Sequence, residues 1–268
     1  MNLIQHNLFP GGKSKAVTLS YDDGVIHDRR FVEILNRYGI KSTFHLNSGT
    51  LDKEGYVTSA EVQKLYQGHE ISAHSVTHPH LETLPPEQLS WQILEDRRAL
   101  ESLAGYPVRG MSYPYGTYNQ KIISALPAFG MEYARTTESH EDFYLPKDFL
   151  KWMPTCHHSQ DIQKKAEYFI KANTKNRLLL FYIWGHTYEF DRENNWELIE
   201  QFCAQVAAHS ESLWFATNIE IVDYLRAMTQ LRTDVAGNSV RNFSSQSVWI
   251  SINGKARELA SGEFLRIA

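Results

Sequence analysis

Short apolar runs alternate with longer amphipathic segments along most of the chain, from residue 16 to about residue 228. The run Ala16–Tyr21 is short and apolar, which is typical of a buried strand. The segment Asp28–Tyr38 carries apolar residues at helical spacing and is followed by Gly39, a residue that suits the left-handed cap of a helix. This first unit therefore predicts a strand followed by a helix.

The alternation of strand-like and helix-like segments repeats downstream. Further strands are predicted over Lys41–Asn47, Glu70–Ala73, Val108–Ser112, Met131–Arg135, Arg177–Trp184 and Leu213–Ala216. Helices are predicted over Ser59–Gln67, Pro85–Leu103, Asn119–Leu126, Asp161–Ala172, Asn195–Ala208 and Ile219–Met228. The stretch Thr136–His158 shows little periodicity. About seven strand–helix units in one chain indicate an α/β protein with a parallel sheet.

Two architectures contain such a sheet, a closed barrel and an open, doubly wound sheet. No glycine-rich phosphate loop follows the first strand, which disfavours the nucleotide-binding form of the open sheet. We therefore expect a distorted (β/α) barrel of about seven units over residues 1–231. Beyond it, turn residues separate short segments, and Asn253–Gly254 is a strong hairpin signal. We expect residues 232–268 to form a small C-terminal antiparallel β appendage packed on the barrel.

Composition and charge narrow the class of protein. The chain has 268 residues, of which 42% are hydrophobic and 22% charged, so it can bury a sizeable core. Its net charge of −4 provides no basic field for nucleic acid or an anionic membrane. No apolar run reaches the roughly 18 residues that span a bilayer, and no signal peptide is evident. We therefore expect a cytoplasmic protein that has neither nucleic acid nor a membrane as its partner.

Polar residues gather where the predicted strands end. Asp22–Asp23–Gly24 follows the first strand, and His74–Ser75–Val76–Thr77–His78 follows the third. Tyr113–Pro114–Tyr115–Gly116 follows the fourth, and His186 follows the strand that ends at Trp184. In a parallel barrel the carboxyl ends of the strands form the rim on which active sites lie. We expect all four groups to share that rim.

These side chains fit metal-assisted hydrolysis. Two imidazoles spaced i, i+4 and a carboxylate from another strand offer two nitrogens and one oxygen to a cation, with positions left for water and substrate. Such a cation lowers the pKa of its water towards about 7 and polarises a carbonyl. Of the two adjacent carboxylates, one can ligate while the other accepts a proton, and His186 can protonate a leaving group. The residues therefore predict hydrolysis of an amide or an ester.

At these positions the sequence resembles the NodB-like polysaccharide deacetylases, which form carbohydrate esterase family four. Thr18–Gly24 is similar to the first motif of that family, Thr-Phe-Asp-Asp-Gly. His74–His78 matches the second motif, His-Ser/Thr-x-x-His, in full. Tyr113–Gly116 matches the end of the third motif, and Leu180–His186 resembles the fifth. The motif order and the strand–helix framework cover roughly residues 14–228.

The resemblance implies a hydrolase that removes acetyl groups from N-acetylated or O-acetylated carbohydrate by attack of a metal-bound water. It implies that Asp22 is the general base and His186 the general acid. The backbone N–H of Tyr115 would help to stabilise the oxyanion. The divalent metal, zinc in most of the family, would be held by Asp23, His74 and His78.

Three positions depart from the family pattern. The third-motif arginine that orients the base is Ser112 here, and Arg135, at another strand end, is a candidate replacement. The fourth motif, Asp-x-x-Asp-Trp, is present as residues 148–152 with Lys151 in place of the second aspartate, which would tune the acid. A leucine of the acetyl pocket is replaced by a tryptophan. The residues that we expect to contact substrate are Tyr113, Trp152, Trp184 and Arg135.

Three further features each have two interpretations. Thr155–His158 could line the site or add a ligand, or it could form a polar loop beside a partly buried thiol. His45 could face the mouth of the barrel or belong to the core. Glu189 could orient His186 or simply begin the next helix.

Two alternative functions stay open beside the deacetylase. A relative with the same fold that hydrolyses a small cyclic amide, as allantoinase-like members do, need not retain the full metal set, whereas this chain has all three candidate ligands. A non-catalytic carbohydrate-binding protein would need neither Asp22 nor His186. The complete set of candidate residues therefore favours the deacetylase.

Overall fold

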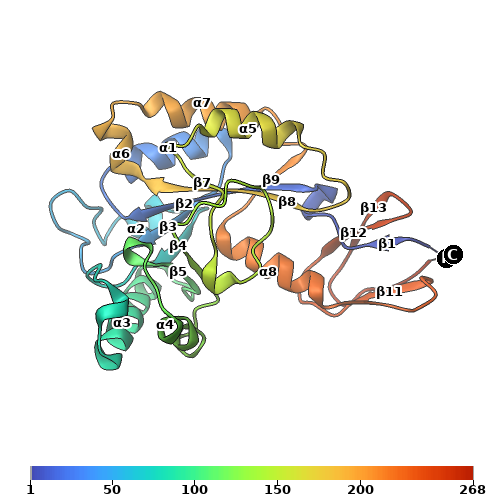
Figure 1. Cartoon of the computed structure of the whole chain (residues 1–268), viewed down its shortest axis with the longest axis horizontal. Helices are drawn as coiled ribbons and strands as arrows, with labels where there is room; N and C mark the ends of the chain where they lie inside the picture. Colours follow the sequence, from blue (N-terminus) through green and yellow to red (C-terminus); the bar gives the residue numbers. More distant parts are fainter. Residues whose placement is uncertain (1, 268) are drawn as a thin grey trace.

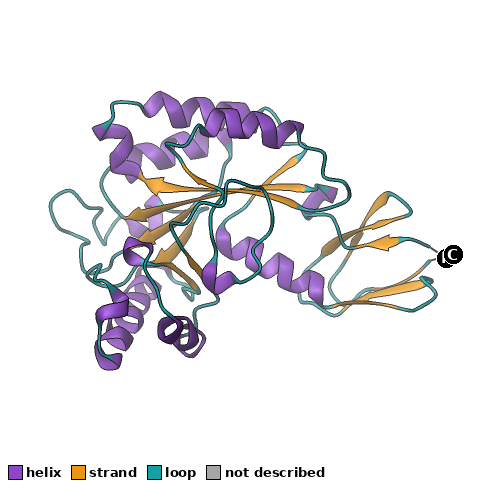
Figure 2. Cartoon of the chain, viewed as in Figure 1, coloured by secondary structure: helices purple, strands orange, loops and turns teal. Residues whose placement is uncertain are grey.

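A parallel sheet lies at the centre of the computed structural model, which describes residues 2–267, and helices surround it (Figures 1 and 2). The order of the strands is β6-β5-β4-β3-β2-β8-β7, and β9 pairs with the beginning of β2. The eight strands are Lys15–Asp23 (β2), Thr43–Leu46 (β3), Glu70–Ala73 (β4), Gly110–Ser112 (β5), Tyr133–Arg135 (β6), Cys156–His157 (β7), Leu179–His186 (β8) and Leu213–Phe215 (β9). The predicted α/β class with parallel strands is confirmed.

The sheet curls into an incomplete barrel, and residues 152–157 lie between its two edges. On one side the amide of Trp152 donates to the carbonyl of Ala134 beside β6, at 3.0 Å. On the other side the amide of Thr155 donates to the carbonyl of Tyr182 in β8, at 2.8 Å, and β7 continues this pairing. The stretch that lacks periodicity in the sequence thus contains a strand. A strand of two residues is too short to leave an alternating pattern.

The helices cover both faces of the sheet. In Figure 1, α1, α5, α6 and α7 lie on one side, and α3, α4 and α8 on the other. The helix α6 begins directly after β8 and was not predicted, whereas α2 is shorter than its predicted range. The bounds are Asp28–Tyr38 (α1), Val62–Leu65 (α2), Pro86–Ala104 (α3), Gln120–Ala125 (α4), Ile162–Lys171 (α5), Thr187–Arg192 (α6), Trp196–Ala207 (α7) and Asn218–Thr229 (α8). Within residues 2–267, none of these helices is long and apolar enough to cross a bilayer.

Strand β2 is buried on both faces, and this positions the candidate site. Successive side chains of a strand point to opposite faces. Val17, Leu19 and Tyr21 belong to the main hydrophobic core. The alternate residues Thr18, Ser20 and Asp22 are polar and also buried. Thr18 donates to the Asn218 side chain at 2.9 Å. The same alternation places the Asp22 carboxylate inside the barrel.

The carboxyl group of Asp28 connects three elements beneath the rim. It stands at the start of α1 and accepts hydrogen bonds from the hydroxyl of Tyr66 at 2.6 Å and from that of Thr187 at 2.5 Å. Tyr66 follows α2, and Thr187 begins α6. Burial raises the pKa of Asp28 to about 7, because the charged form loses its hydration.

Asp28→Asn is expected to change how stability depends on pH. Between pH 4 and 7 the folded chain holds a proton on Asp28 that the unfolded chain has lost. The free energy of unfolding of the wild type should therefore fall by about 1.4 kcal/mol per pH unit from this group, and the variant should lack that slope. Urea unfolding across this range measures it, with the exposed Asp191→Asn as the control. Parallel curves for wild type and Asp28→Asn would refute the assignment.

Beyond α8 the chain forms antiparallel sheets, as predicted. The predicted turn Asn253–Gly254 joins β12 to β13, with both residues in the left-handed region that a tight hairpin requires. The N-terminal strand β1, which was not predicted, pairs with β12 (Figure 1). The boundary at residue 231 stays a prediction. The strands are Ile4–Gln5 (β1), Leu231–Thr233 (β10), Ser239–Asn242 (β11), Val248–Ile252 (β12), Lys255–Leu259 (β13) and Phe264–Arg266 (β14), arranged as β1-β12-β13 and β10-β11-β14.

Candidate active site

The carboxyl ends of β2, β4, β5 and β8 bring the candidate residues to one rim of the sheet. Asp22 and Asp23 are the last two residues of β2, and His74 follows β4 directly. His186 is the last residue of β8 and lies opposite Asp22 in the parallel register. These residues therefore lie together at the rim where the sequence places them, and their roles stay predictions.

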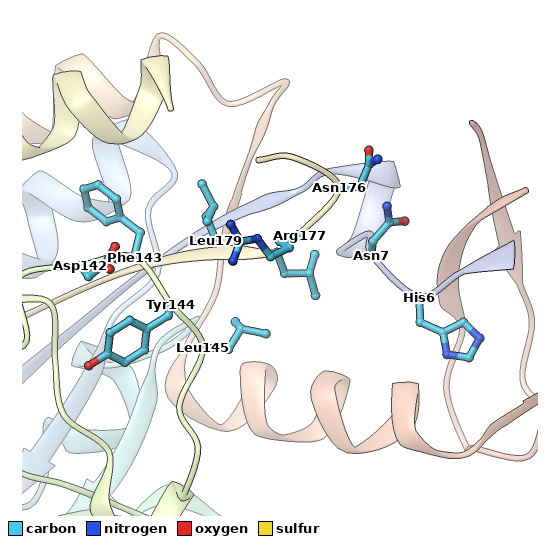
Figure 3. Close-up of a pocket in the computed structure, with 10 residues that line it drawn as sticks. His6, Asn7, Asp142, Phe143, Tyr144, Leu145, Asn176, Arg177 and Leu179 are labelled. Carbon is cyan, nitrogen blue, oxygen red and sulfur yellow. Dashed lines mark hydrogen bonds between the residues drawn. The ribbon is translucent and has the colours of Figure 1, made fainter. Parts of the chain in front are cut away.

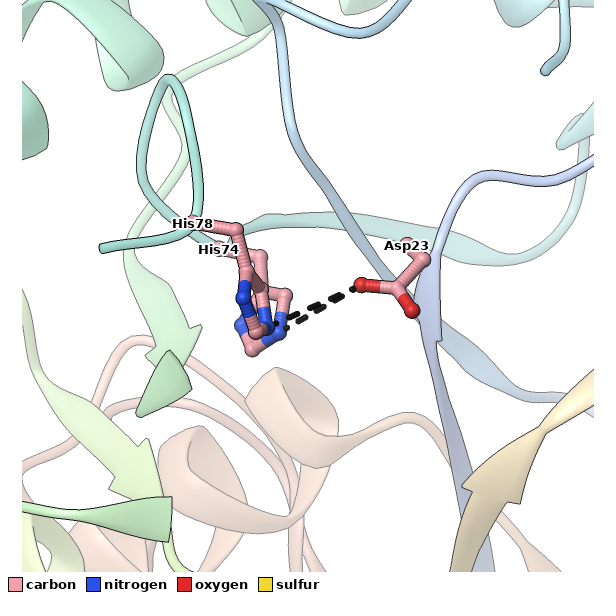
Figure 4. Close-up of side chains that lie close together, drawn as sticks. All are labelled: Asp23, His74 and His78. Carbon is pink, nitrogen blue, oxygen red and sulfur yellow. Dashed lines mark ion pairs between the residues drawn. The ribbon is translucent and has the colours of Figure 1, made fainter. Parts of the chain in front are cut away.

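Asp23, His74 and His78 converge on a common point (Figure 4). The Asp23 Oδ1 lies 3.7 Å from the His74 Nε2 and 3.9 Å from the His78 Nε2. Ligands bound tetrahedrally at about 2.0–2.1 Å from zinc lie about 3.3 Å apart, so small movements of these side chains would bring them onto one ion. The His74 side chain is almost fully buried, whereas those of Asp23 and His78 are partly exposed, which leaves access from solvent.

The surroundings of His74 orient its ring for a metal. The His74 Nδ1 lies 2.9 Å from the carbonyl oxygen of Ser112, which can only accept a hydrogen bond. The proton therefore resides on Nδ1, and the lone pair of Nε2 points towards Asp23. A carbonyl partner on the second nitrogen is typical of histidines that bind metals. The residues present thus fit a divalent cation.

Three site residues have left-handed backbones. The φ angles are 81° at Asp23, 57° at His78 and 58° at Tyr115. Each such residue costs about 1–3 kcal/mol when it is not glycine, and the surrounding structure must hold it. The Ser75 hydroxyl does so at one point, because it accepts from the amide of His78 at 3.1 Å. Such strain is concentrated at sites of function.

Asp22 forms a buried ion pair with Arg135, which comes from the end of β6. The side chains are 3% and 0% exposed, respectively. Burial opposes the charged form, but Arg135 and His74 hold the pKa of Asp22 well below its ordinary range. Ser112, which stands where the family has arginine, donates to the Asp22 Oδ1 at 3.2 Å. Arg135 therefore lies against the Asp22 carboxylate, and its role as replacement for the missing arginine stays a prediction. Its fully buried side chain presents no surface to a substrate, which corrects the prediction that Arg135 contacts substrate.

Arg135→Gln is expected to lower the free energy of unfolding by about 3–5 kcal/mol, because it leaves the carboxylate of Asp22 buried without its partner. Urea unfolding provides the measurement. The double variant Asp22→Asn/Arg135→Gln carries no uncompensated charge and should recover part of the loss. A single variant that unfolds like the wild type would contradict the ion pair.

His186 lies between the metal candidates and Glu189. Its Nε2 is 4.0 Å from the Asp23 Oδ2, and its Nδ1 is 3.4 Å from the Glu189 Oε1. Burial lowers the pKa of His186, but Glu189 and the charge of Asp22 outweigh this and raise the pKa above its ordinary value. Glu189 therefore lies in the first turn of α6 and also faces the imidazole.

The residues expected to contact substrate lie in different environments. Tyr113 and Trp152 are 1% exposed, and the hydroxyl of Tyr113 donates to the carbonyl of Leu150. Neither ring presents surface to a ligand, which corrects the prediction for both.

Trp184 is half-buried, and the Arg135 guanidinium lies 4.6 Å from its ring centre. Tyr115 is exposed, and its ring packs against His78 beside the metal candidates.

His45 was ambiguous in the sequence, and the structure places it beside Asp22. It is fully buried on β3, in register with Asp22 on the neighbouring strand. Burial lowers the pKa of His45 well below its ordinary value, so its imidazole is neutral. The pairing of β2 with β3 shows that His45 is a neighbour of Asp22, and the periodicity of the sequence does not reveal this pairing.

A surface cavity of about 490 Å³ lies away from this site (Figure 3). It is lined by His6, Asn7, Tyr144 and Arg177, among others, near the amino end of β8. His186 stands at the opposite end of that strand. Neither group of possible metal ligands found among residues 2–267 lines this cavity.

Residues 10–134 match the family model described as polysaccharide deacetylase, which confirms the resemblance carried by the motifs. The peptidoglycan-N-acetylglucosamine deacetylase PgdA of Listeria monocytogenes is 30% identical over 112 residues, 41% of this chain and 23% of that protein. A chitooligosaccharide deacetylase of Azorhizobium caulinodans is 26% identical over 136 residues, 49% of this chain and 63% of that protein. The matches thus span less than two thirds of the length of these relatives.

Solved structures show the same fold. A polysaccharide deacetylase homologue from Mycobacterium smegmatis aligns over 84% of this chain and 94% of its own, with a TM-score of 0.65 and 17% identity. The Xyl-CE4 domain of a xylanase from the hindgut metagenome of Trinervitermes trinervoides aligns over 80% and 92%, with a TM-score of 0.56 and 17% identity. The predicted fold class, a distorted barrel with additional C-terminal strands, is confirmed.

Proposed function

We propose that this protein is a metal-dependent hydrolase that removes acetyl groups from acetylated carbohydrate, since residues 10–134 match the polysaccharide deacetylase family model. The observation that supports it best is the convergence of Asp23, His74 and His78 beside a second, buried carboxylate. A structural role for these residues would not require the Nε2 atoms of both imidazoles to face the Asp23 carboxylate. We treat residues 1–231 as the catalytic unit.

Asp23, His74 and His78 would hold the cation, most suitably zinc, since two nitrogens and one oxygen are ligands that zinc accepts. When bound, such an ion supplies a Lewis acid that lowers the pKa of water and polarises the acetyl carbonyl. The protein residues then handle the protons. Asp22, kept ionised by Arg135 and Ser112, accepts a proton from the attacking water.

His186 supplies a proton at the other side of the reaction. Its raised pKa keeps the imidazole protonated over a wider pH range, so it can donate to the leaving nitrogen or oxygen. Water adds its oxygen to the carbonyl carbon, the bond from that carbon to the sugar nitrogen or oxygen breaks, and acetate leaves. The backbone N–H of Tyr115 is our candidate donor to the developing oxyanion.

An acetylated sugar is the substrate class that the relatives support, since several carry names of peptidoglycan, chitin or chitooligosaccharide deacetylases. The exposed ring of Tyr115 beside His78 offers an aromatic face on which a sugar ring can stack. The half-buried Trp184, in contact with Arg135, is the second candidate contact. Both lie on the rim that carries the proposed metal ligands.

Acetate release tests the proposal. The purified protein is incubated with N-acetylated chitooligosaccharides, O-acetylated xylooligosaccharides and the cyclic amide allantoin, each with zinc, with chelator, and with zinc restored. We expect acetate from at least one acetylated sugar with zinc, its loss with chelator and its return with added zinc. Allantoin contains no acetyl group, so its hydrolysis is followed separately by the appearance of the ring-opened acid. Turnover of allantoin alone would support the cyclic-amide hydrolase instead. No turnover above the chelated control with any substrate would reject the hydrolase.

A further inference from the structure

We propose that His157, His158 and Glu189 form a second site for a divalent transition-metal cation, separate from the site of Asp23. These residues come from the end of β7, the turn that follows it and the helix α6. The two sites have no residue in common. The inference stands on its own ligands and does not require the protein to be a deacetylase.

The ligand atoms of this cluster converge more closely than those of the first site. The Glu189 Oε2 lies 2.9 Å from the His157 Nε2 and 3.3 Å from the His158 Nε2. Two tetrahedral ligands on one zinc ion lie about 3.3 Å apart. Both imidazoles thus direct the nitrogen remote from the backbone at one carboxylate oxygen, at separations that one ion can bridge.

The Nδ1 atoms of His157 and His158 have different surroundings, and both are compatible with a metal on Nε2. The His157 Nδ1 accepts from the backbone amide of Ser159 at 3.3 Å and lies 2.8 Å from the Ser159 hydroxyl oxygen. With a cation on Nε2 the ring proton would move to Nδ1, where the hydroxyl oxygen can accept it. The His158 side chain is 3% exposed, and its Nδ1 has no hydrogen-bond partner among residues 2–267. Burying an imidazole with so few polar contacts is costly, and a cation on its Nε2 would offset that cost.

The donor set also selects the kind of cation. Two imidazole nitrogens and one carboxylate oxygen suit Zn²⁺ and Co²⁺, whereas Mg²⁺ and Ca²⁺ prefer oxygen ligands alone. The His157 and Glu189 side chains are 18% and 14% exposed, so an ion can enter from solvent and a water can complete its coordination. The other Glu189 oxygen faces His186, so an ion here would be in contact with a neighbour of the proposed acid.

Hydrogen bonding is the competing explanation for the cluster. The Glu189 Oε2 also accepts from the backbone amide of His186 at 3.2 Å, and it could accept from the His157 ring. That arrangement would hold Glu189 in place with no ion. The two explanations differ in the number of metal ions that the chain binds.

Metal stoichiometry separates them. Protein stripped with chelator is dialysed against Zn²⁺, and in parallel against Mg²⁺, and the bound metal is counted per chain. We expect two Zn²⁺ per wild-type chain, one in His157→Ala, one in His78→Ala and none in the double variant. Mg²⁺ should leave the second site empty. The visible absorption of bound Co²⁺ should fall in His157→Ala, which gives a spectroscopic readout.

The exposed His209→Ala is the matched control and should still bind two ions. Circular dichroism checks that each variant is folded, and Glu189→Gln provides a second variant that removes one ligand without a cavity. The site is refuted if wild type binds only one Zn²⁺, or if His157→Ala and Glu189→Gln bind as many ions as wild type. A failure of the proposed function is distinguishable, because it would leave the ion that depends on His157 in place while no substrate releases acetate.

Discussion

Asp22→Asn is expected to lower kcat for acetate release by about 10²–10⁴-fold with little change in KM. Asparagine keeps the size of the side chain but cannot accept a proton from water. The metal ligand Asp23 is left intact, so zinc binding should be retained. Initial rates of acetate release with zinc present provide the measurement, together with the zinc content of the same preparations.

The pairing of Asp22 with Arg135 requires a control for folding. Asp22→Asn leaves the Arg135 guanidinium buried without its counterion, so part of any loss could come from unfolding. Rates are therefore compared at a temperature where circular dichroism shows both proteins folded. Asp22→Glu keeps the charge and should retain more activity than Asp22→Asn. Turnover within a few-fold of wild type in a folded Asp22→Asn would reject Asp22 as the base.

His186→Gln is expected to lower kcat by about 10²–10⁴-fold through loss of the proton donor. The effect should depend on the leaving group. An aryl acetate expels a weakly basic phenolate that needs little protonation, so the variant should keep much more of its activity towards it than towards an N-acetylated sugar. Rates with both substrates measure the difference, and His209→Gln serves as the control. Equal losses on the two substrates would contradict the role of His186 as acid.

The hydrophobic periodicity of the sequence predicted most strands of the parallel sheet and most of the longer helices that pack against it. The predicted bounds of α1 and of β4 agree with the structure. In α1 the apolar residues recur at helical spacing and Gly39 ends the helix. The helix α6 was missed because it is only six residues long and follows His186 without a turn. The strand β1 pairs with β12 near the other end of the chain, and such a contact leaves no local signal.

The candidate metal ligands could be predicted because both histidines lie in one short motif and the carboxylate at a strand end. The partner of Asp22 required the fold, since Arg135 is 113 residues away in the sequence. Burial was the part that the sequence could not give. Tyr113 follows a strand end and Trp152 closes a family motif, so both were expected to contact substrate. Both side chains instead pack into the core. Aromatic residues serve both purposes, and only packing distinguishes them.

Anomalous diffraction at the zinc edge from crystals grown with zinc would locate the proposed ion. We predict a peak about 2.0–2.2 Å from a carboxylate oxygen of Asp23 and from the Nε2 atoms of His74 and His78. Imidazoles turned away from Asp23, with no peak between them, would contradict it.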